Sequence, residues 1–362
     1  NSPKGTESLK GVIRKPLRTK GACSQAKLPD RHARRFTCKQ APQTFGKSPM
    51  PTRSTPAITV VAAIIRGKDG RICLSKRPDN KHQGGRWEFP GGKVEQGEAL
   101  SAALARELEE ELGMAGATSS PFMTIAHQYD DLHVTLHFRD VRVWQGEPEG
   151  REGQRVQWFL PGELADLRFP AANQPVVNAI QLPEQLVVAP EDITLHELLA
   201  GIDRLNGEQQ GLYLRQWSDH AEVAAVVAQC QQRGVKVWLR AVDTQSVATA
   251  KALGVFAVHF PGRALAQLDE RPAFDGITSA AVHDQAARDK AGNLGLDMAL
   301  VSPVLPTPTH PGKPALGWPQ AELLMKGAPL ACYALGGVAP GDLVNARDHG
   351  AVGVAGIRAF WP

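Results

Sequence analysis

Apolar and polar positions follow two different patterns along the chain, and the change between them predicts two domains. In residues 57–180 the pattern varies: apolar runs and period-two alternation, typical of strands, stand beside stretches with helical spacing. The predicted strands are residues 57–66, 71–77, 133–144 and 157–160, and the predicted helices are residues 100–112 and 174–180. This order predicts an α+β domain with a mixed sheet sandwiched by helices.

Beyond residue 193, short apolar runs recur regularly, and helical stretches separate them. The predicted strands are residues 211–215, 235–239, 255–259, 277–279, 298–301, 331–335 and 352–355. Strands that alternate with helices at this spacing predict parallel βα units, here an α/β (β/α)8 TIM barrel. The pattern of apolar and polar residues changes at residues 185–192, which predicts a linker there. We therefore expect the domains at residues 50–184 and 193–362.

The charge of the chain is divided unevenly. Residues 1–49 carry 12 Lys and Arg against two acids, Glu7 and Asp30, whereas the rest of the chain holds 29 basic and 35 acidic residues. The mildly acidic remainder gives no support to a nucleic-acid duplex as partner. We expect residues 1–49 to be a disordered or non-native leader before a natural start at Met50, with a transit peptide as the alternative.

The cysteines and the apolar runs bear on location. The five cysteines are scattered without metal-ligand spacing, which is typical of free thiols in a reducing compartment. No run of about 18 or more apolar residues predicts a membrane span. We therefore expect a cytoplasmic protein that does not bind a membrane.

A dense group of acidic residues follows the glycine pair at 91–92. On the predicted helix, Glu107 and Glu111 lie one turn apart, with Glu110 beside them. Carboxylates crowded in this way repel each other unless a cation lies among them. Hard oxygen ligands suit Mg²⁺, or Mn²⁺, which also coordinates substrate phosphates. The residues thus predict a divalent-cation site that takes a phosphate substrate.

The spacing of this group is more specific than its charge. Gly92, five residues, Glu98 and seven residues lead into Arg106-Glu-Leu-Glu-Glu-Glu-Leu-Gly-Met114. Arg106 can orient one glutamate through a bidentate pair, and the glycine pair lets the backbone approach metal and phosphate closely. The alternative is a solvated acidic helix face with ordinary ion pairs. The joint register of Gly92, Glu98 and Gly113 disfavours it.

This segment fills every position of the signature G-x5-E-x7-R-E-U-x-E-E-x-G-U and so resembles the Nudix hydrolase family. The flanks resemble its MutT-type, 8-oxo-dGTP diphosphatase branch: residues 76–92 with the Trp-Glu-Phe-Pro-Gly-Gly loop, residues 150–154, and the Phe-Pro-Ala-Ala-Asn segment at 169–173. The resemblance implies metal ligands at Gly91 (through its carbonyl), Glu107, Glu110, Glu111 and Glu152. It implies nucleotide contacts at Arg77, His82, Glu88, Phe89, Pro90, Gly91 and Asn173, the last through an amide that both donates to and accepts from the base.

Several of these residues have simpler interpretations when taken singly. Phe89 is commonly a core residue, His82 a hydrogen-bonding loop residue, and Asn173 a cap of the following helix. Their joint register with the acidic segment favours the functional interpretation.

The implied reaction is attack of water on the β-phosphorus of a nucleoside triphosphate, which releases a monophosphate and diphosphate. Arg106, Glu107, Glu110 and Glu152 are the expected catalytic residues. One glutamate must accept the proton of the water, and the sequence leaves Glu107 and Glu152 as alternatives.

The second domain resembles thiamine-phosphate synthase and its TenI-like relatives over most of residues 193–362. The segments that carry the likeness are residues 302–309, 334–338 and 350–356, with His259 and His283 where that family has histidines. The resemblance implies a phosphate site formed by Gly336, Gly337, Ala355 and Gly356.

The same comparison shows departures. The family's metal-binding Asn-Asp-Arg motif falls on Thr244-Gln245-Ser246, and its second metal aspartate falls near Ala264. We therefore expect a barrel that has lost synthase activity. It either keeps a pocket for a phosphorylated small ligand or serves as a structural or regulatory module.

Three functions remain in competition. The first is hydrolysis of 8-oxo-dGTP to 8-oxo-dGMP and diphosphate, which clears oxidised nucleotides and prevents mutation. The second is a Nudix hydrolase of another diphosphate linked to thiamine metabolism. The third is a ligand-sensing protein in which the barrel carries the main function. Asn173 and Phe89 favour the first, and the complete acidic segment disfavours the third.

Overall fold

The computed structural model describes residues 57–78, 84–128, 133–217, 219–307 and 314–362. The expected leader at residues 1–49, the expected start at Met50 and the nucleotide contact expected at His82 lie outside these ranges. Within them, no helix is long and apolar enough to cross a membrane.

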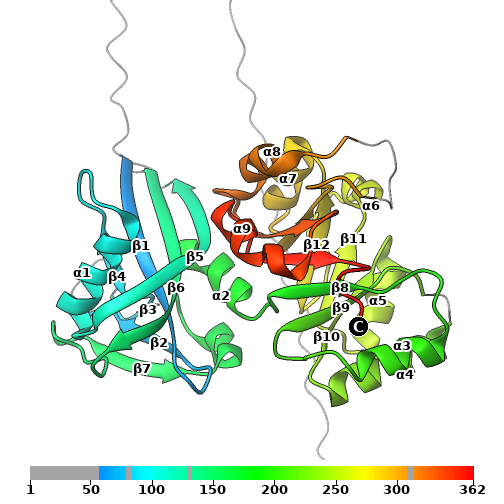
Figure 1. The fold of residues 1–362 in the computed structure, drawn as a ribbon, viewed down its shortest axis with the longest axis horizontal. Helices are drawn as coiled ribbons and strands as arrows, with labels where there is room; N and C mark the ends of the chain where they lie inside the picture. Colours follow the sequence, from blue (N-terminus) through cyan, green and yellow to red (C-terminus); the bar gives the residue numbers. More distant parts are fainter. Residues whose placement is uncertain (1–56, 79–83, 129–132, 218, 308–313) are drawn as a thin grey trace, which may run out of the picture. The chain divides into compact units, whose positions relative to one another are not determined.

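A mixed sheet forms the centre of the first domain (Figure 1). Its main path runs β3-β2-β1-β6-β5, with β4 paired to β1 and β7 to β2. β1 and β6 are parallel, and the other paired strands are antiparallel. The strands are β1 (Ala57–Arg66), β2 (Ile72–Lys76), β3 (Trp87–Glu88), β4 (Gly91–Lys93), β5 (Ala115–Gln128), β6 (His133–Gln145) and β7 (Arg155–Phe159).

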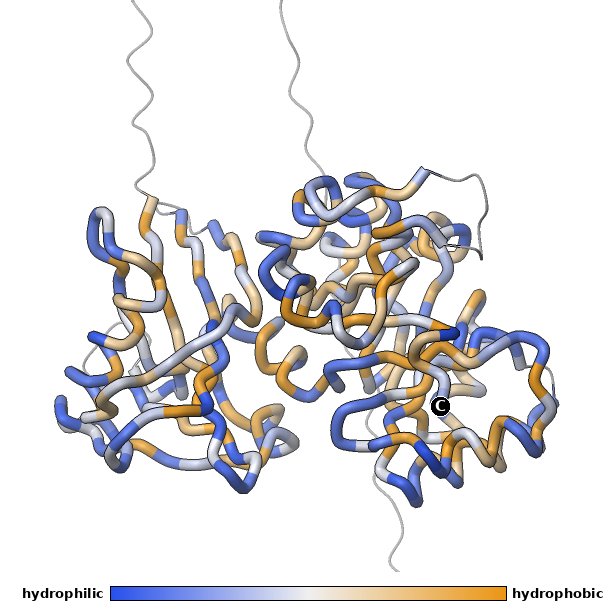
Figure 2. Tube along the Cα trace, in the orientation of Figure 1, coloured by the Kyte–Doolittle hydropathy of each residue, from blue (hydrophilic) through white to orange (hydrophobic). Residues whose placement is uncertain are grey.

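The apolar run of β1 is continuous because both of its faces are buried. Val61, Ala63 and Ile65 belong to one hydrophobic cluster, together with Leu104, Leu108 and Leu112 of helix α1 (Leu100–Leu112). Ala62 and Ile64 point to the opposite face and belong to a second cluster, which includes Val176 and Val177 of helix α2 (Gln174–Ile180). Hydrophobic residues accordingly follow the strands in Figure 2.

Helix α1 ends where the sequence predicts. Gly113 adopts the left-handed conformation, with φ 72°. Its N–H donates to the carbonyl of Glu109, and the N–H of Met114 donates to that of Leu108. This cap fixes the C-terminal end of the helix that carries Glu107, Glu110 and Glu111.

The edge strand β5 was not predicted from the sequence. Its residues, Ala115–Gln128, include Gly116 and Pro121 and alternate poorly between polar and apolar positions. An edge position tolerates proline, and the β5–β6 pairing contains register shifts that interrupt any regular alternation. The short strands β3 and β4 were missed as well, because they lie in a segment rich in Gly and Pro that predicts a loop.

The second domain is a closed barrel of eight parallel strands in the order β10-β11-β12-β13-β14-β15-β8-β9. This confirms the predicted (β/α)8 architecture. The strands are β8 (Gln185–Val188), β9 (Gln210–Leu214), β10 (Lys236–Arg240), β11 (Ala257–Phe260), β12 (Ile277–Val282), β13 (Met298–Val301), β14 (Ala331–Leu335) and β15 (Gly353–Gly356). The helices between them are α3 (Leu195–Ile202), α4 (His220–Gln232), α5 (Thr244–Ala252), α6 (Gly262–Gln267), α7 (Gln285–Asn293), α8 (Gly317–Met325) and α9 (Leu343–Asp348).

The linker predicted at residues 185–192 is wrong over its first half. Gln185–Val188 forms β8, which pairs with β15 on one side and β9 on the other and so closes the barrel. The Leu-Val-Val run of this strand is buried. Its length of four residues and the prolines on either side, Pro183 and Pro190, hid it from a periodicity analysis.

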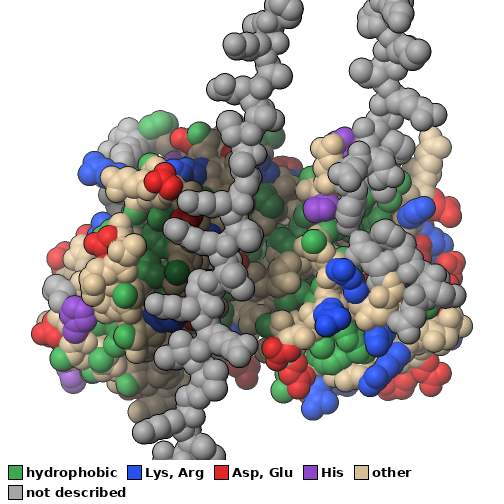
Figure 3. Space-filling view, turned by 180° about the vertical axis from the view of Figure 1, so that it is seen from behind, with side chains coloured by type: hydrophobic (Ala, Val, Ile, Leu, Met, Phe, Trp, Pro, Cys, Tyr) green, Lys and Arg blue, Asp and Glu red, His purple; other side chains and the backbone are tan. Residues whose placement is uncertain are grey.

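Acidic and basic side chains both occur on the face that Figure 3 shows, with uncharged and hydrophobic surface between them. The presence of both charges on this face agrees with the 29 basic and 35 acidic residues that the sequence holds beyond residue 49.

Candidate active site

A glycine pair brings the start of β4 against β1 and α1. Gly91 has φ 146°, and a Cβ atom placed on it would lie 2.2 Å from the carbonyl oxygen of Val61. A Cβ on Gly92 would lie 2.3 to 2.4 Å from the carboxylate of Glu107. Gly91 is therefore required sterically by strand pairing, whereas a side chain at position 92 would displace the carboxylate of Glu107.

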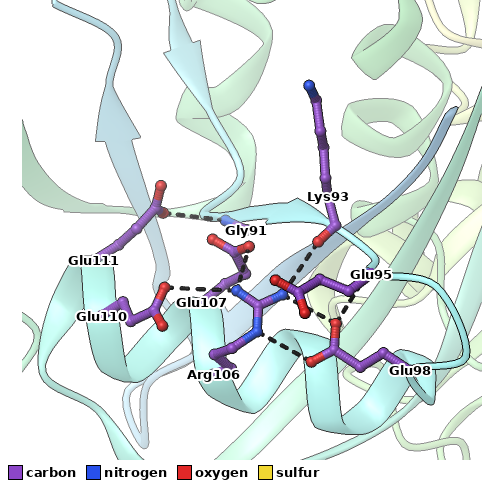
Figure 4. Close-up of polar contacts among 8 residues, drawn as sticks. All are labelled: Gly91, Lys93, Glu95, Glu98, Arg106, Glu107, Glu110 and Glu111. Carbon is purple, nitrogen blue, oxygen red and sulfur yellow. Dashed lines mark hydrogen bonds and ion pairs between the residues drawn. The ribbon is translucent and has the colours of Figure 1, made fainter.

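Arg106 organises the acidic residues around this loop (Figure 4). Its Nε and Nη2 donate to the two carboxylate oxygens of Glu98, each at 3.0 Å. Its Nη1 donates to Oε1 of Glu107 at 2.8 Å and lies 3.5 Å from Oε2 of Glu110. The bidentate partner expected for Arg106 is thus Glu98, and Glu107 is held by a single additional bond.

The ion pairs affect the protonation of both partners. The hydrogen bonds from Arg106 hold the pKa of the Glu98 carboxyl below its ordinary value. The bonds to Glu98 and Glu107 raise the pKa of Arg106 further above its already high value. Arg106 is therefore a permanent cation that donates to Glu98 and Glu107.

Glu111 lies on the other side of the glycine pair. Its Oε2 accepts a hydrogen bond of 3.3 Å from the N–H of Gly91. Burial raises the pKa of Glu111 to about 7, and the charges of Glu107, Glu152 and Glu88 raise it in the same direction, against the bond from Gly91. Three other carboxylates, one from the same helix and two from distant parts of the chain, therefore act electrostatically on Glu111.

The donor set fits a divalent cation. Glu107 and Glu111 supply hard oxygen atoms one helical turn apart beside the Gly91 backbone. Burial raises the pKa of Glu111, and the negative charges of neighbouring carboxylates add to that effect. Within the ranges that the structure describes, no three acidic, histidine or cysteine side chains are already drawn together as a metal site. Glu107 is held by Arg106, Glu152 is exposed, and Glu110 has 61% of its side chain exposed, so binding requires side-chain movement.

Among the expected nucleotide contacts, Arg77 directly follows β2, Glu88 ends β3, and Pro90 precedes the glycine pair. Arg77 and Glu88 form an ion pair of 2.5 Å between Nη1 and Oε2. Pro90 is buried, and its carbonyl accepts the N–H of Ala63 at 2.8 Å. The two charged residues are thus fixed next to the glycine pair.

Phe89 has a different role from the one expected. Its ring is 4% exposed, packs edge-on against Phe138 with a centroid distance of 5.6 Å, and stacks on Phe169 at 5.6 Å with an interplanar angle of 18°. This burial agrees with the core interpretation. It does not support contact between the ring and a nucleotide base.

Asn173 stands at the junction of a 3-10 turn (Ala171–Asn173) and α2, with 8% of its surface exposed. Its side chain makes no capping hydrogen bond to α2, so the simpler interpretation as a helix cap is wrong. Buried amides are normally hydrogen-bonded, and among the described residues the Asn173 amide is not used as a cap, so it can serve another partner.

Two residues of the site were not singled out as functional from the sequence. Glu98 was recognised only as part of the signature, although it is the principal partner of Arg106. Arg86 was not considered, and its Nη1 donates to the carbonyl of Phe169 at 3.0 Å. Only the fixed spacing of Glu98 from Arg106 signalled the first contact. The second spans 83 residues and has no local signal.

The barrel contains a cavity of about 770 Å³ at the ends of several strands. Gly336, Gly337 and Gly356 line it, the first two with φ of 92° and 72°. Arg215, His283 and Arg358 also line it, and no acidic residue lines it in the part of the chain that the structure describes. Ala355, expected beside these glycines, is instead fully buried in β15 and does not line the cavity.

Histidine 259 is enclosed within the barrel. Ser279 Oγ donates to the carbonyl of Val258 and lies 3.0 Å from Nδ1 of His259, whose ring also packs against Tyr213. Because the one hydroxyl proton of Ser279 is used on Val258, Nδ1 of His259 is the donor in their contact. Burial lowers the pKa of His259 to about 3, so the ring is neutral.

The barrel does not fit the metal that its likeness to the synthase implies. Thr244-Gln245-Ser246 begins helix α5 and supplies no carboxylate. The adjacent Asp243 is used as the helix cap and accepts hydrogen bonds from the N–H and Oγ of Ser246. Ala264, near which the second metal aspartate was expected, is a buried alanine in α6.

Comparison with known proteins assigns both parts of the chain. The family profile described as "NUDIX domain" matches residues 61–179, and the profile described as "Thiamine monophosphate synthase" matches residues 187–360. The second match begins inside β8, which agrees with the corrected start of the barrel.

Individual relatives match the first domain. An 8-oxo-dGTP diphosphatase of Escherichia coli is 40% identical over 125 residues, which cover 34% of this chain and 96% of that protein. A CTP pyrophosphohydrolase of the same organism is 37% identical over 122 residues, which cover 34% of this chain and 90% of that protein. A solved structure from a study of MutT of Aliivibrio salmonicida and Vibrio cholerae has 45% identity, a TM-score of 0.31, and covers 34% of this chain and 96% of its own.

Proposed function

Because the chain belongs to the Nudix hydrolases, with relatives of the MutT type, we propose that it hydrolyses 8-oxo-dGTP to 8-oxo-dGMP and diphosphate. The observation that carries this proposal is the cluster of Glu107 and Glu111 at the glycine pair, organised by Arg106. The amide of Asn173, which caps no helix, supports a guanine-type base as the group that is recognised.

The reaction adds water across one bond. The oxygen of water attacks the β-phosphorus, the bond from that phosphorus to the oxygen shared with the α-phosphate breaks, and the nucleoside monophosphate leaves. Glu107 or Glu152 accepts the proton of the water. Arg106 holds Glu107 in place through a hydrogen bond, and Arg77 pairs with Glu88 close to the glycine pair in the sequence.

The residues proposed to hold Mg²⁺, with Mn²⁺ as an alternative, are Glu107, Glu110, Glu111, Glu152 and the carbonyl of Gly91. A bound cation of this kind supplies charge neutralisation at the phosphates and lowers the pKa of bound water. In the cell, we propose that the enzyme clears oxidised guanine nucleotides from the cytoplasmic pool and so protects the fidelity of DNA replication.

The proposal is tested by measuring kcat/KM of the full chain with Mg²⁺ for 8-oxo-dGTP, dGTP and CTP. We expect 8-oxo-dGTP to be preferred over dGTP by about a hundredfold or more, because a site that hydrogen-bonds a distinctive group rejects analogues that lack it. CTP is included because one relative is named for it. Equal turnover of 8-oxo-dGTP and dGTP, or a preference for CTP, would contradict the proposed substrate.

For the barrel we propose a pocket for a phosphorylated small molecule without synthase activity. The glycine turns at Gly336, Gly337 and Gly356 expose backbone N–H groups, and Arg215 and Arg358 line the same cavity. The observation that favours loss of synthesis is the capping role of Asp243, which leaves the family's metal motif without a free carboxylate.

We expect calorimetric titration of the full chain to show thiamine monophosphate binding at least about tenfold more tightly than unphosphorylated thiamine, with or without EDTA. The same protein should form no thiamine monophosphate from the synthase substrates in the presence of Mg²⁺. Equal affinity for the two ligands would contradict the phosphate pocket, and product formation would contradict the loss of synthesis.

A further inference from the structure

Two neighbouring carbonyl groups attach the segment that carries Asn173 to β3. The N–H of Trp87 donates to the carbonyl of Arg168 at 2.9 Å, and Nη1 of Arg86 donates to the carbonyl of Phe169 at 3.0 Å. The first contact is made by backbone and does not depend on the side chain at position 87. The second depends entirely on the guanidinium of Arg86.

Few free torsions separate the carbonyl held by Arg86 from Asn173. Pro170 follows Phe169, and its ring restricts φ, which is −55° here. The carbonyl of Pro170 then accepts the N–H of Asn173 at 2.9 Å, which closes the 3-10 turn. A displacement of the Phe169 carbonyl is therefore passed on to the position of the Asn173 amide.

The other end of Arg86 contacts the proposed nucleotide site as well. Its backbone carbonyl accepts the N–H of Arg77 at 2.9 Å, and the N–H of Gly85 donates to the carbonyl of Arg77 at 2.9 Å. Arg77 in turn pairs with Glu88. Arg86 thus connects Arg77, one of the proposed nucleotide contacts, with the segment proposed for the base.

The packing beneath this segment limits its approach to the sheet. The ring of Phe169 stacks on that of Phe89 and is 8% exposed, so the segment cannot approach the sheet more closely. Stacked rings slide past one another at low cost, whereas a hydrogen bond from a charged donor defines a position along the stack. Arg86 supplies that bond.

We propose that Arg86 is a positioning residue for nucleotide selection: it holds the Phe169 carbonyl and thereby sets where the Asn173 amide meets the base. The inference rests on the proposed function of the first domain. Arg86 itself touches no reacting atom in this account, so its loss affects recognition of the base more than the chemical step.

The test compares Arg86→Met, Arg86→Lys and wild type in the full chain, with kcat and KM measured for 8-oxo-dGTP and dGTP. We expect Arg86→Met to raise KM for 8-oxo-dGTP and to reduce the preference over dGTP about tenfold, with kcat changed less than about threefold. Arg86→Lys keeps a charged donor and should restore most of the preference. Arg71→Met is the matched control, because Arg71 is exposed at the β1–β2 turn and pairs only loosely with Asp69.

A double-mutant cycle with Asn173→Ala separates positioning from a general loss of structure. If Arg86 acts through Asn173, Arg86→Met should have little further effect on the preference once Asn173 is removed. Thermal unfolding of each variant shows whether the fold is retained. Arg86→Gln provides a second, neutral donor should Arg86→Met prove unstable.

The outcomes distinguish the two proposals. A wild-type chain without preference among the nucleotides overturns the proposed substrate, and with it any selective role of Arg86. A wild-type preference that Arg86→Met leaves unchanged, or effects of Arg86→Met and Asn173→Ala that simply multiply, overturns the role of Arg86 alone. Should the wild type prefer CTP, the same ratios are measured for CTP against dGTP and are interpreted in the same way.

Discussion

Glu107→Gln should lower kcat for nucleotide hydrolysis by about 10²- to 10⁴-fold while the protein remains folded. The carboxylate of Glu107 lies over Gly92 and is held by Nη1 of Arg106, and glutamine keeps its size while removing its charge and basicity. Steady-state kinetics with saturating Mg²⁺ and 8-oxo-dGTP measure the effect, and a circular dichroism spectrum verifies the fold.

The matched control is Glu109→Gln. Glu109 belongs to the same helix and the same acidic run but is exposed and takes no part in the Arg106 network, so its variant should retain activity within about twofold. Equal losses in both variants would indicate that the total negative charge of the helix matters and not the position of Glu107.

Glu152→Gln addresses the choice of general base. If Glu152 takes the proton, its variant should lose both rate and the acidic limb of the pH profile of kcat, whereas Glu107→Gln would retain that limb at a lower rate. The reverse pattern would assign the proton to Glu107.

Gly91→Ala should destabilise the first domain by about 3 kcal/mol or more and abolish hydrolysis. The added Cβ meets the Val61 carbonyl oxygen at 2.2 Å, and φ of 146° is unfavourable for alanine. Because β4 pairs with β1 at this point, relief of the clash requires separating the strands that support Glu111. Calorimetry of the full chain should show the corresponding unfolding transition lowered by roughly 10 °C.

Gly97→Ala is the control for backbone strain alone. Gly97 also has a positive φ, of 80°, but a Cβ there has nothing within 4 Å. We expect a loss of only about 1 kcal/mol in that variant and nearly normal activity. A Gly91→Ala protein as stable and active as Gly97→Ala would show that β4 is not held against β1 in the way described.

The acidic helix was predictable because its signals are local. Apolar residues at helical spacing, a terminal glycine and glutamates in fixed register all lie within residues 92–114, and the structure confirms the helix at Leu100–Leu112. Seven of the eight barrel strands were found for the same reason. Each is an apolar run followed by a stretch with helical spacing, so their positions follow from the sequence to within three residues.

The remaining features depend on contacts between distant segments. Glu111 owes its raised pKa to burial and to Glu107, Glu152 and Glu88. Helical spacing places Glu107 beside Glu111, but no spacing rule brings Glu88 and Glu152 to them. The enclosure of Phe89 between two other rings, and the contact of Arg86 with Phe169, arise only when the segments on either side of β3 pack. The assignments of the metal and nucleotide ligands stay predictions.

The closure of the barrel by β8 has a consequence for how the chain can be divided. Only residues 181–184 separate the last turn of α2 from this strand, so the two folded units share almost no spacer. A fragment that begins after the expected linker, at residue 193, would lack strand β8 of the barrel. The edges of β9 and β15 would then be unpaired and open to intermolecular strand addition. A gene fragment meant to carry the barrel alone must therefore begin before Gln185, at the very end of the hydrolase unit.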